Sequence, residues 1–256
     1  MIAEVITIGS ELLHGLVPNT NLAMISKLLA EAGIWPSYHS TVGDEPEPAG
    51  EVFRTAVRRA DLVIATGGLG PTADDITRRV IATVFRRRLI LDGVVLDQIR
   101  ARFRERGLDM PPINESQALV PRGATVIENP VGSAPGLHFS HLETECFALP
   151  GVPAEAEAML RSYVIPFVKS RNPGLVSGLR VVRTIGIGES ALAERLAGFE
   201  LEEPDLMLGT IALASGVDLH LCASSVDALW LQGVLDRGER KLLERAGPHA
   251  YALGSR

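Results

Sequence analysis

The stretch LVIATGGLGPTADD, residues 62–75, carries the strongest structural signal in the chain. Its first five residues, Leu62–Thr66, form a short apolar run of the kind found in strands buried on both faces. Three glycines follow within four positions, and the residues after Asp75 have helical spacing up to Phe85. A buried strand, a glycine-rich loop and a helix in this order predict one unit of a parallel α/β sheet. Ligands bind such sheets at the carboxyl ends of the strands, where this loop lies.

The segments on either side of this stretch repeat the alternation of strand and helix. Apolar runs predict strands at Ala3–Ile8 and Pro36–Val42, and helical spacing follows each of them, at 22–33 and 48–59. This rhythm predicts a three-layer α/β domain with a mainly parallel sheet over residues 1–170. The rest of that domain is less regular, with a helix expected at 94–106, strands at 125–127, 136–139 and 145–149, and a closing helix at 153–168.

Turn-forming residues at 170–174, Ser-Arg-Asn-Pro-Gly, predict a linker to a second domain. Residues 175–256 are expected to form that domain, which is small and of the α+β type. Its expected elements are a strand at 179–185, a helix at 190–196, strands at 206–212 and 217–223, and a helix at 227–245.

The composition is that of an ordinary globular protein. Of 256 residues, 46% are hydrophobic and 22% are charged, and the formal net charge is -6. A net acidic chain lacks the basic field that nucleic-acid binding requires, so no nucleic-acid partner is expected. Two cysteines, Cys146 and Cys222, are too few for a disulfide framework. Without a signal peptide or an apolar run of about 18–20 residues, the chain is expected to be cytoplasmic, with no membrane partner.

The glycine loop is suited to binding an anion. Backbone amides of glycine approach a phosphate closely, and the following helix adds a partial positive charge. The loop lacks the lysine of a Walker motif, and Pro71 interrupts its weak match to the dinucleotide fingerprint. Asp74 and Asp75 would repel a pyrophosphate unless a divalent cation lay between them, which predicts a hard metal ion with oxygen ligands. The alternative is a tight turn whose aspartates only cap the helix.

Polar residues also follow the other predicted strands. Ser10 and Glu11 follow the first strand, Asn19–Asn21 begin its helix, and Asp44 and Glu45 follow the second strand. In a parallel sheet these positions share one edge with the glycine loop. Each of them alone is also typical of a cap or a turn.

Two substitutions separate a ligand site from a simple turn. Gly68→Val is expected to block a phosphate while leaving the fold largely intact, because only the approach of the ligand needs the missing Cβ. Asp75→Asn is expected to lower metal-dependent turnover by about two orders of magnitude or more while preserving stability, because it removes the negative charge that a hard cation needs but still caps a helix.

Eight motifs occur in order along the chain. They are GSELL at 9–13, PNTN at 18–21, VGDE at 42–45, TGGLGPTADD at 66–75, NESQA at 114–118, NPVGSAPG at 129–136, LPGVP at 149–153 and GIGESALAERL at 186–196. Together they resemble the CinA family (competence/damage-inducible protein A). The resemblance implies a MogA/MoeA-like domain of the molybdopterin-binding type, followed by a KH-like domain. It also implies metal-dependent ADP-ribose pyrophosphatase activity, or molybdopterin as the ligand of the same pocket.

The resemblance also implies roles for individual residues. The carboxylates around a divalent metal (Mg, Mn or Co) or its activated water would be those of Asp44, Asp74 and Asp75. The groups facing the phosphates would belong to Ser10, Gly67, Gly68, Gly70 and Thr72. The residues shaping a nucleotide or pterin pocket would include Asn21, Asn114, Gly132, Ser133 and Gly151.

The chain departs from the family pattern in three places. Ser10 replaces the usual threonine and retains the hydroxyl, and Ile211-Ala212 replaces the usual Tyr-Pro after Gly-Thr. Many members continue into a nicotinamide-nucleotide amidase domain, which is expected to be absent because the sequence ends at Arg256. The GIGES segment does not supply the GxxG loop of RNA-binding KH domains, so no RNA binding is expected.

Three functions remain open from the sequence. They are hydrolysis of ADP-ribose or a related dinucleotide, binding of molybdopterin or its adenylated form, and ligand binding by a domain without catalytic power. The Asp74–Asp75 pair favours the first over the third, because pure anion binding would prefer a basic site. It does not separate the first from the second. A homodimer is expected in each case.

Overall fold

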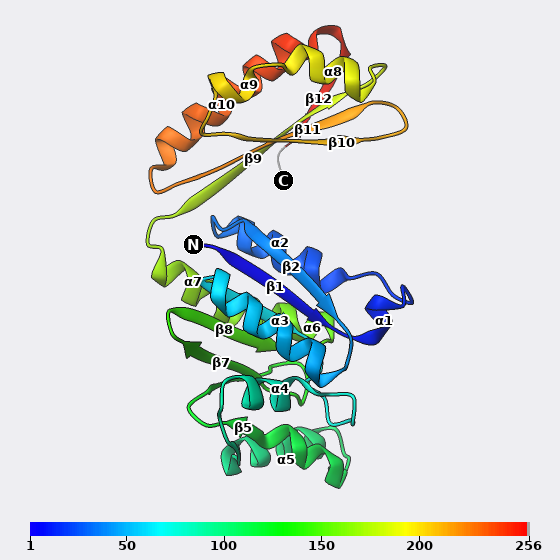
Figure 1. Cartoon of the computed structure of the whole chain (residues 1–256), viewed down its shortest axis with the longest axis vertical. Coiled ribbons are helices and arrows are strands. Elements are labelled where there is room, and N and C mark those ends of the chain that lie inside the picture. The colour runs from blue at the N-terminus through cyan, green and yellow to red at the C-terminus, as the bar shows by residue number, and fades with distance from the viewer. Residues whose placement is uncertain (255–256) are drawn as a thin grey trace. The chain divides into compact units, whose positions relative to one another are not determined.

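The computed structural model describes residues 1–254, which divide into two compact units (Figure 1). The first unit contains Met1–Ala30 and Ile34–Val168, and the second contains Glu31–Gly33 and the residues from Lys169 onward. The sequence predicts domains at 1–170 and 175–256, and the main division of the structure falls between residues 168 and 169. None of the helices within residues 1–254 combines the length and the apolar character needed to cross a membrane.

The first unit is built on a six-stranded sheet with the order β2-β1-β3-β8-β7-β6. Four neighbouring strands are parallel: β2 (Pro36–Val42), β1 (Ala3–Ile8), β3 (Leu62–Thr66) and β8 (Thr144–Leu149). Two further strands, β7 (Gly136–His141) and β6 (Thr125–Ile127), run antiparallel to their neighbours. Every residue of β1 and β3 is buried, as expected for central strands of a parallel sheet that is covered on both faces.

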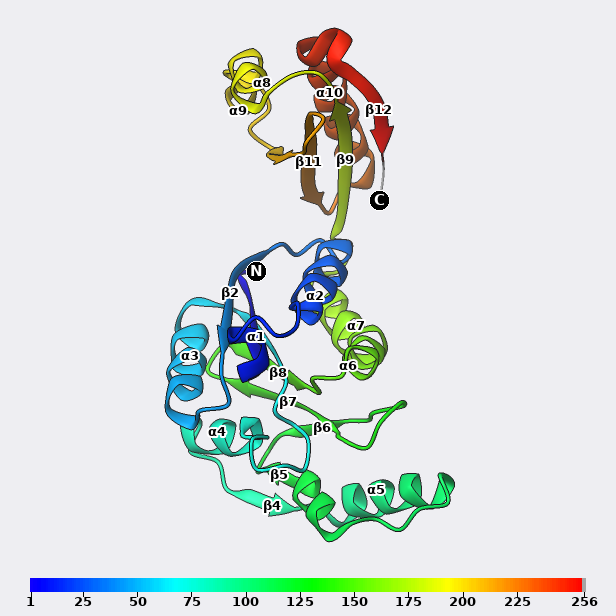
Figure 2. The ribbon, with the colours of Figure 1, turned by 90° about the vertical axis from the view of Figure 1, so that its right-hand side faces the viewer.

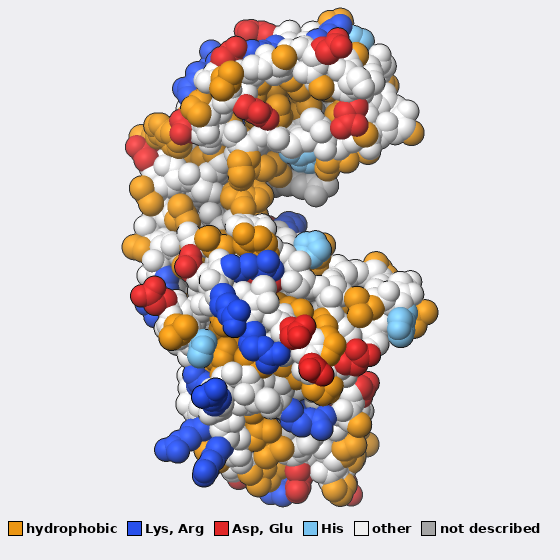
Figure 3. Space-filling model, in the orientation of Figure 1, with side chains coloured by type: hydrophobic (Ala, Val, Ile, Leu, Met, Phe, Trp, Pro, Cys, Tyr) orange, Lys and Arg blue, Asp and Glu red, His pale blue; other side chains and the backbone are white. Residues whose placement is uncertain are grey.

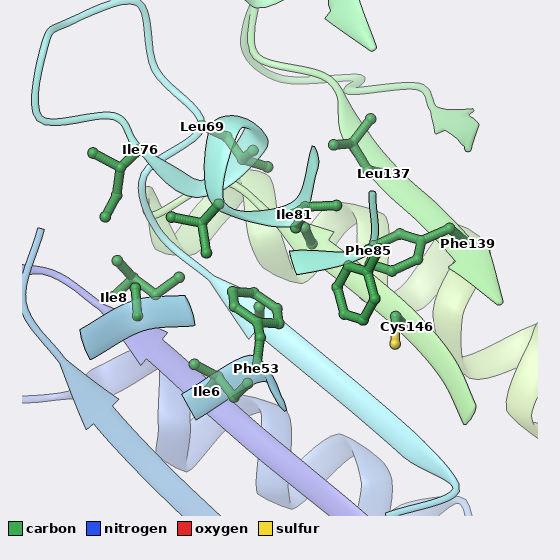
Figure 4. Close-up of a cluster of buried hydrophobic side chains, with 14 of the residues drawn as sticks. Ile6, Ile8, Phe53, Leu69, Ile76, Ile81, Phe85, Leu137, Phe139 and Cys146 are labelled. Carbon is green, nitrogen blue, oxygen red and sulfur yellow. The ribbon is translucent and has the colours of Figure 1, made fainter. Parts of the chain in front are cut away.

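Helices cover both faces of this sheet (Figure 2). One face carries α2 (Thr20–Glu31), α6 (Pro153–Met159) and α7 (Ile165–Arg171), and the other carries α3 (Pro46–Arg59) and α4 (Thr77–Val84). Phe53 of α3 and Ile81 of α4 pack with Ile6 of β1 and with Phe85 in a buried cluster (Figure 4). The expected three-layer α/β architecture with a mainly parallel sheet is therefore confirmed.

The region between α4 and β6 differs from the prediction. There β4 (Leu89–Leu91) pairs antiparallel with β5 (Leu119–Pro121), and α5 (Gly93–Glu105) and a 3-10 helix (Pro112–Ala118) lie between them in the chain. The sequence pattern does not predict either strand, because three residues are too few to show an alternation of apolar and polar side chains.

The helix predicted at 153–168 is also different. A π-helical turn at Leu160–Val164 separates α6 from α7, and α7 continues to Arg171, into the predicted linker. Pro166 explains the interruption, because it lacks the N–H that a regular helix would use and its ring crowds the preceding turn.

The second unit is a small α+β fold, as the sequence predicts. Its strands, in sheet order, are β10 (Met207–Ala212), β11 (Val217–Ser225), β9 (Val176–Thr184) and β12 (Ala250–Gly254). Its helical segments are α8 (Glu189–Leu196), α9 (Phe199–Glu202), α10 (Ala228–Ala246) and a 3-10 turn at Gly247–His249. Leu219 and Leu221 of β11 are buried with Leu235 of α10 in one core. The sequence pattern predicts neither α9 nor β12, which are short and lack a clear periodicity.

Candidate functional site

The parallel strands bring four loops to one edge of the sheet. Two hydrogen bonds between Ser10 and Asp44 connect the loops after β1 and β2. The Ser10 N–H donates to Asp44 Oδ2 (2.8 Å), and the Asp44 N–H donates to Ser10 Oγ (3.1 Å). The loops after β3 and β8 are joined by a bond from the Gly67 N–H to the Leu149 carbonyl (3.0 Å). The polar residues predicted at strand ends thus lie along one edge.

The glycine loop follows β3 and comprises residues 67–75. Its first carbonyl oxygens accept hydrogen bonds from α4. Thr77 donates from its hydroxyl and its N–H to the carbonyl oxygens of residues 67 and 68 (2.7 and 3.1 Å). Arg78 donates to the carbonyl oxygens of residues 69 and 70 (2.6 Å each). The N–H groups of Gly68 and Leu69, in contrast, have no acceptor within residues 1–254. Adjacent amides without partners form the kind of nest that binds an anion.

The backbone at the start of this loop requires glycine. Gly67 and Gly68 have φ values of +107° and +65°. A Cβ at Gly67 would overlap the carbonyl oxygen of Ile8, and one at Gly68 would overlap the hydroxyl of Thr77. The structure therefore contradicts the expectation that Gly68→Val leaves the fold intact, since this change would displace Thr77 and strain the backbone.

Arg78 lies beneath the loop and is only 5% exposed. Burial lowers its pKa to about 10, although the neighbouring Asp75 carboxylate favours the charged form. The guanidinium is therefore protonated at neutral pH and adds a positive charge behind the loop amides. No sequence pattern identifies this residue, because the Thr-Arg-Arg segment at 77–79 resembles an ordinary exposed helix face, and Arg79 beside it is indeed exposed.

The three predicted carboxylates have different surroundings. Asp75 accepts hydrogen bonds from the N–H of Gly70 (2.6 Å) and from the N–H and hydroxyl of Thr72 (2.8 and 2.5 Å), so its oxygens hold the loop together. Asp44 accepts one bond from the loop after β1. Asp74 is exposed, and hydrogen bonds from Thr72 and from its own backbone N–H lower its pKa.

These aspartates do not form a ready-made metal cage. Within residues 1–254, no three His, Cys, Asp or Glu side chains come together in a way that could hold a metal ion. Mg²⁺ commonly binds through one or two carboxylates, with substrate phosphate and water completing its coordination. The residues present fit that second arrangement, with Asp74 as the carboxylate that the loop leaves most accessible.

A pocket of about 280 Å³ opens beside the glycine loop, between the ends of β1 and β3 and the start of α2. Three residues of the predicted site, Asn21, Gly67 and Gly151, line it. Asn21 Nδ2 donates to Thr66 Oγ1 (3.0 Å) and to the Gly151 carbonyl (2.8 Å). Thr66 Oγ1 in turn donates to the Pro150 carbonyl (2.8 Å). Asn21 thereby joins α2, β3 and the loop after β8.

Asn114, Gly132 and Ser133 form a separate group. Asn114 Nδ2 and Ser133 Oγ both donate to Gln117 Oε1 (3.0 and 3.3 Å). The Gly132 N–H donates to Asn129 Oδ1 (2.8 Å), and Gly132 and Ser133 line a small hollow of about 30 Å³. The structure therefore brings these three predicted residues together, around a glutamine that the sequence analysis does not single out although it lies in the NESQA motif.

This second group is linked to the first through α6. Asn129 Nδ2 donates to Glu155 Oε2 (2.6 Å), and Glu155 lies in the first turn of α6. The loop that leads into α6 contains Gly151, which lines the 280 Å³ pocket. Glu155 is a further residue that the sequence analysis does not identify, because an acidic residue in the first turn of a helix is common.

Basic side chains gather on the surface over α3 (Figure 3), but at least one of them has a structural role. Arg59 donates to both oxygens of Glu4, a fully buried residue of β1, at 2.8 Å each. Its guanidinium also lies 4.0 Å from the centre of the Tyr38 ring. Arg59 therefore neutralises a buried carboxylate in the sheet and is not available as a free anion-binding group.

Both units match known families. Residues 4–170 match the family described as probable molybdopterin binding domain, and residues 179–252 match the damage-inducible protein CinA KH domain. The solved structure of a CinA protein of unknown function from Thermoplasma acidophilum is similar to this chain. It is 36% identical in sequence, with a TM-score of 0.59, and the match covers 66% of this chain and 96% of that one.

Two bacterial proteins named putative competence-damage inducible protein are similar over nearly the whole chain. The one from Caldicellulosiruptor saccharolyticus is 37% identical over 99% of this chain, and the one from Halalkalibacterium halodurans is 40% identical over 98%. The matches cover 61% and 60% of those relatives, so this chain spans about three fifths of their length.

The fold and the loops at its sheet edge define a molybdopterin-binding-type domain joined to a KH-type domain. The molybdopterin-binding-type domain implied by the sequence motifs is confirmed. The chain belongs to the CinA family of competence/damage-inducible proteins.

Proposed function

We propose that the first unit binds a phosphorylated nucleotide or pterin at the carboxyl edge of its sheet, and that it hydrolyses the pyrophosphate bond of a dinucleotide such as ADP-ribose with a divalent cation. The observation that supports this best is the contrast in the glycine loop between carbonyl groups that are hydrogen-bonded and N–H groups that are not. Four successive carbonyl oxygens are bonded to Thr77 and Arg78, while the N–H groups of Gly68 and Leu69 have no acceptor in residues 1–254.

In this proposal the residues of the loop have distinct tasks. The amides of Gly68 and Leu69 bind phosphate oxygens, and Asp75 and Arg78 keep the loop in the required shape. Asp74 holds the cation together with phosphate oxygens, and Asp44 lies after β2, hydrogen-bonded to the loop after β1. A bound divalent cation supplies charge neutralisation and lowers the pKa of an attacking water.

A substrate panel tests the proposal. The purified protein is incubated with ADP-ribose, NAD, FAD, CoA and molybdopterin-AMP, each with Mg²⁺, Mn²⁺ or Co²⁺, and the products are separated by chromatography. Metal-dependent release of AMP from ADP-ribose supports the proposal. Lack of cleavage with every combination of substrate and metal contradicts it.

A second candidate is binding of a pterin or nucleotide without hydrolysis. One observation favours it: the oxygens of Asp75 are occupied by the loop, and residues 1–254 contain no metal site formed by protein groups alone. In that case the panel gives saturable binding of molybdopterin-AMP and no products. For either function we propose a homodimer without a nucleic-acid partner, and a solution mass near the 27.4 kDa of one chain would contradict the dimer.

A further inference from the structure

We propose that the 280 Å³ pocket holds the heterocycle of the ligand and that Asn21 recognises an exocyclic amine of that heterocycle through Oδ1. The inference rests on the proposed function, which places the phosphates at the glycine loop. It adds the class of group that the neighbouring pocket selects, a flat bicyclic ring with a hydrogen-bond donor on its edge. Adenine and pterin both carry such a donor as an exocyclic amine.

The orientation of the Asn21 amide is fixed by its neighbours. Nδ2 lies between Thr66 Oγ1 and the Gly151 carbonyl oxygen. The Gly151 carbonyl oxygen can only accept a hydrogen bond. Thr66 donates its single hydroxyl hydrogen to the Pro150 carbonyl, so Thr66 Oγ1 can also only accept from Asn21. A reversed amide would place Oδ1 against two acceptors. The side chain is therefore held with Oδ1 turned away from both.

Asn21 Oδ1 is left without a partner. It is a buried atom with no hydrogen bond in the described structure, in a residue that is only 9% exposed. An unpaired buried acceptor is costly, and natural proteins rarely leave one without a reason. Asn21 lines the pocket, but Oδ1 itself has almost no accessible surface, so a donor on a ligand in that pocket reaches it only after a small shift of the surrounding side chains.

Asn19, two residues earlier and also lining the pocket, shows the contrast. Its Nδ2 donates to Thr7 Oγ1 (2.9 Å), and its Oδ1 accepts from the Leu22 N–H (3.1 Å) at the start of α2. Both ends of the Asn19 amide are therefore occupied within the protein. Of the two neighbouring asparagines, Asn21 alone has an acceptor left for a ligand.

The other walls of the pocket favour a heterocycle over a phosphate. No Lys or Arg is among the described residues that line it, and its one charged group is the Glu11 carboxylate, which also accepts hydrogen bonds. Ile8, Leu12 and Val17 supply apolar surface. A volume of about 280 Å³ lies near the lower end of ligand pockets and suits one ring system better than a whole dinucleotide.

Matched ligand pairs test the inference on the unaltered protein. AMP is compared with purine riboside 5′-monophosphate, which lacks the exocyclic amine, and pterin-6-carboxylate is compared with lumazine-6-carboxylate, in which oxygen replaces that amine. Calorimetry gives the four affinities. We expect the amine to strengthen binding about tenfold in at least one pair, the usual effect of one good hydrogen bond. The pair that responds identifies the source of the ring, and equal affinities within both pairs overturn the inference.

Variants then assign the preference to one residue. Asn21→Ala should abolish the preference for the amine, while the matched control Asn19→Ala should keep the ratio of affinities even if both ligands bind more weakly. Thermal melts establish that each variant is folded, and Asn21→Ser, whose shorter side chain does not reach the same position, replaces Asn21→Ala if that variant is unstable. A preference that survives loss of the Asn21 amide overturns the inference.

The same data separate this inference from the proposed function. Hydrolysis of ADP-ribose with no preference for the amine would contradict the inference and leave the hydrolase standing. A preference for the amine that depends on Asn21, without hydrolysis of any substrate, would contradict the hydrolase and leave the inference standing.

Discussion

Asp75 and Arg78 hold the same residue, Gly70, from its two ends. Asp75 accepts the N–H of Gly70 at 2.6 Å, and Arg78 donates to its carbonyl oxygen at 2.6 Å. The negative charge of Asp75, just before α4, and the positive charge of Arg78, within α4, thus fix the conformation of the glycine loop that faces the ligand. The shape of the site depends on this pair even though neither residue needs to touch a substrate.

Arg78→Lys should destabilise the first unit. Lysine keeps the charge but cannot donate to two carbonyl oxygens in the fixed geometry of a guanidinium. We expect a loss of about 3 kcal/mol in the free energy of unfolding, the scale of a charged hydrogen bond with a buried partner. Urea unfolding measures it. The control is Arg79→Lys on the exposed neighbour, which should stay within about 0.5 kcal/mol, and equal losses in both variants would contradict the role given to Arg78.

Asp74→Asn and Asp75→Asn should behave differently. At Asp74 the change removes an exposed charge, so metal-dependent turnover should fall about 100-fold with an unchanged melting temperature. At Asp75 it should also lower the melting temperature, because an amide NH₂ would face an N–H donor of the loop. This replaces the sequence-based expectation that Asp75→Asn preserves stability. Activity and thermal melts are measured on both variants, and a stable but inactive Asp75→Asn would restore that expectation.

Gly68→Ala should cost more stability than the backbone conformation alone explains. Gly68 and Gly107 both have positive φ values, +65° and +70°, but a Cβ meets Thr77 at Gly68 and nothing within 4 Å at Gly107. Gly107→Ala should therefore cost about 1 kcal/mol from strain, and Gly68→Ala at least about twice as much. Denaturant unfolding of the two variants measures the difference, and similar losses would show that the contact with Thr77 relaxes freely.

The second unit should lose stability in acid. The side chain of Glu203 is only 3% exposed, and this burial raises its pKa. Hydrogen bonds from Lys241 (2.7 Å) and Arg237 (3.1 Å) outweigh the effect of burial, so the pKa of Glu203 lies below its usual value. A lowered pKa in the folded state stabilises the unit above the unfolded value of about 4.3, and that contribution disappears as the pH falls further. Melting curves between pH 7 and pH 3 should show this loss.

Glu203→Gln isolates the residue responsible. It should lower stability at pH 7 by about 1–2 kcal/mol and flatten the acid dependence, because the buried pairings lose their charge. Glu202→Gln is the matched comparison: Lys241 and Arg245 also lower the pKa of Glu202, but its side chain is 47% exposed, so its effect on the acid profile should be smaller. An acid profile that is unchanged in Glu203→Gln would count against this assignment.

The parts of the fold that could be predicted are those with a strong local pattern. Ala3–Ile8 and Leu62–Thr66 are mostly apolar and become fully buried strands, and Gly67 and Gly68 of the loop adopt the positive φ values that favour glycine. Arg78 could not be predicted, because burial of one of two adjacent arginines depends on the position of the loop carbonyls in space. The role of Asp75 within the loop was hidden for the same reason.

The antiparallel direction of β7 relative to β8 has a consequence for which loop of this site can change in length. Because β7 runs antiparallel to β8, with Leu137 opposite Ala148, the segment 128–135 that precedes β7 arrives at the same edge as the loops that follow the parallel strands. A hairpin connection between β6 and β7 needs no crossover helix. Residues inserted there would deepen one wall of the site without moving any helix, whereas a longer loop after β1 or β3 must still deliver its chain to α2 or α4. Among the walls of this site, the hairpin is the one that can be lengthened with the least change to the helices.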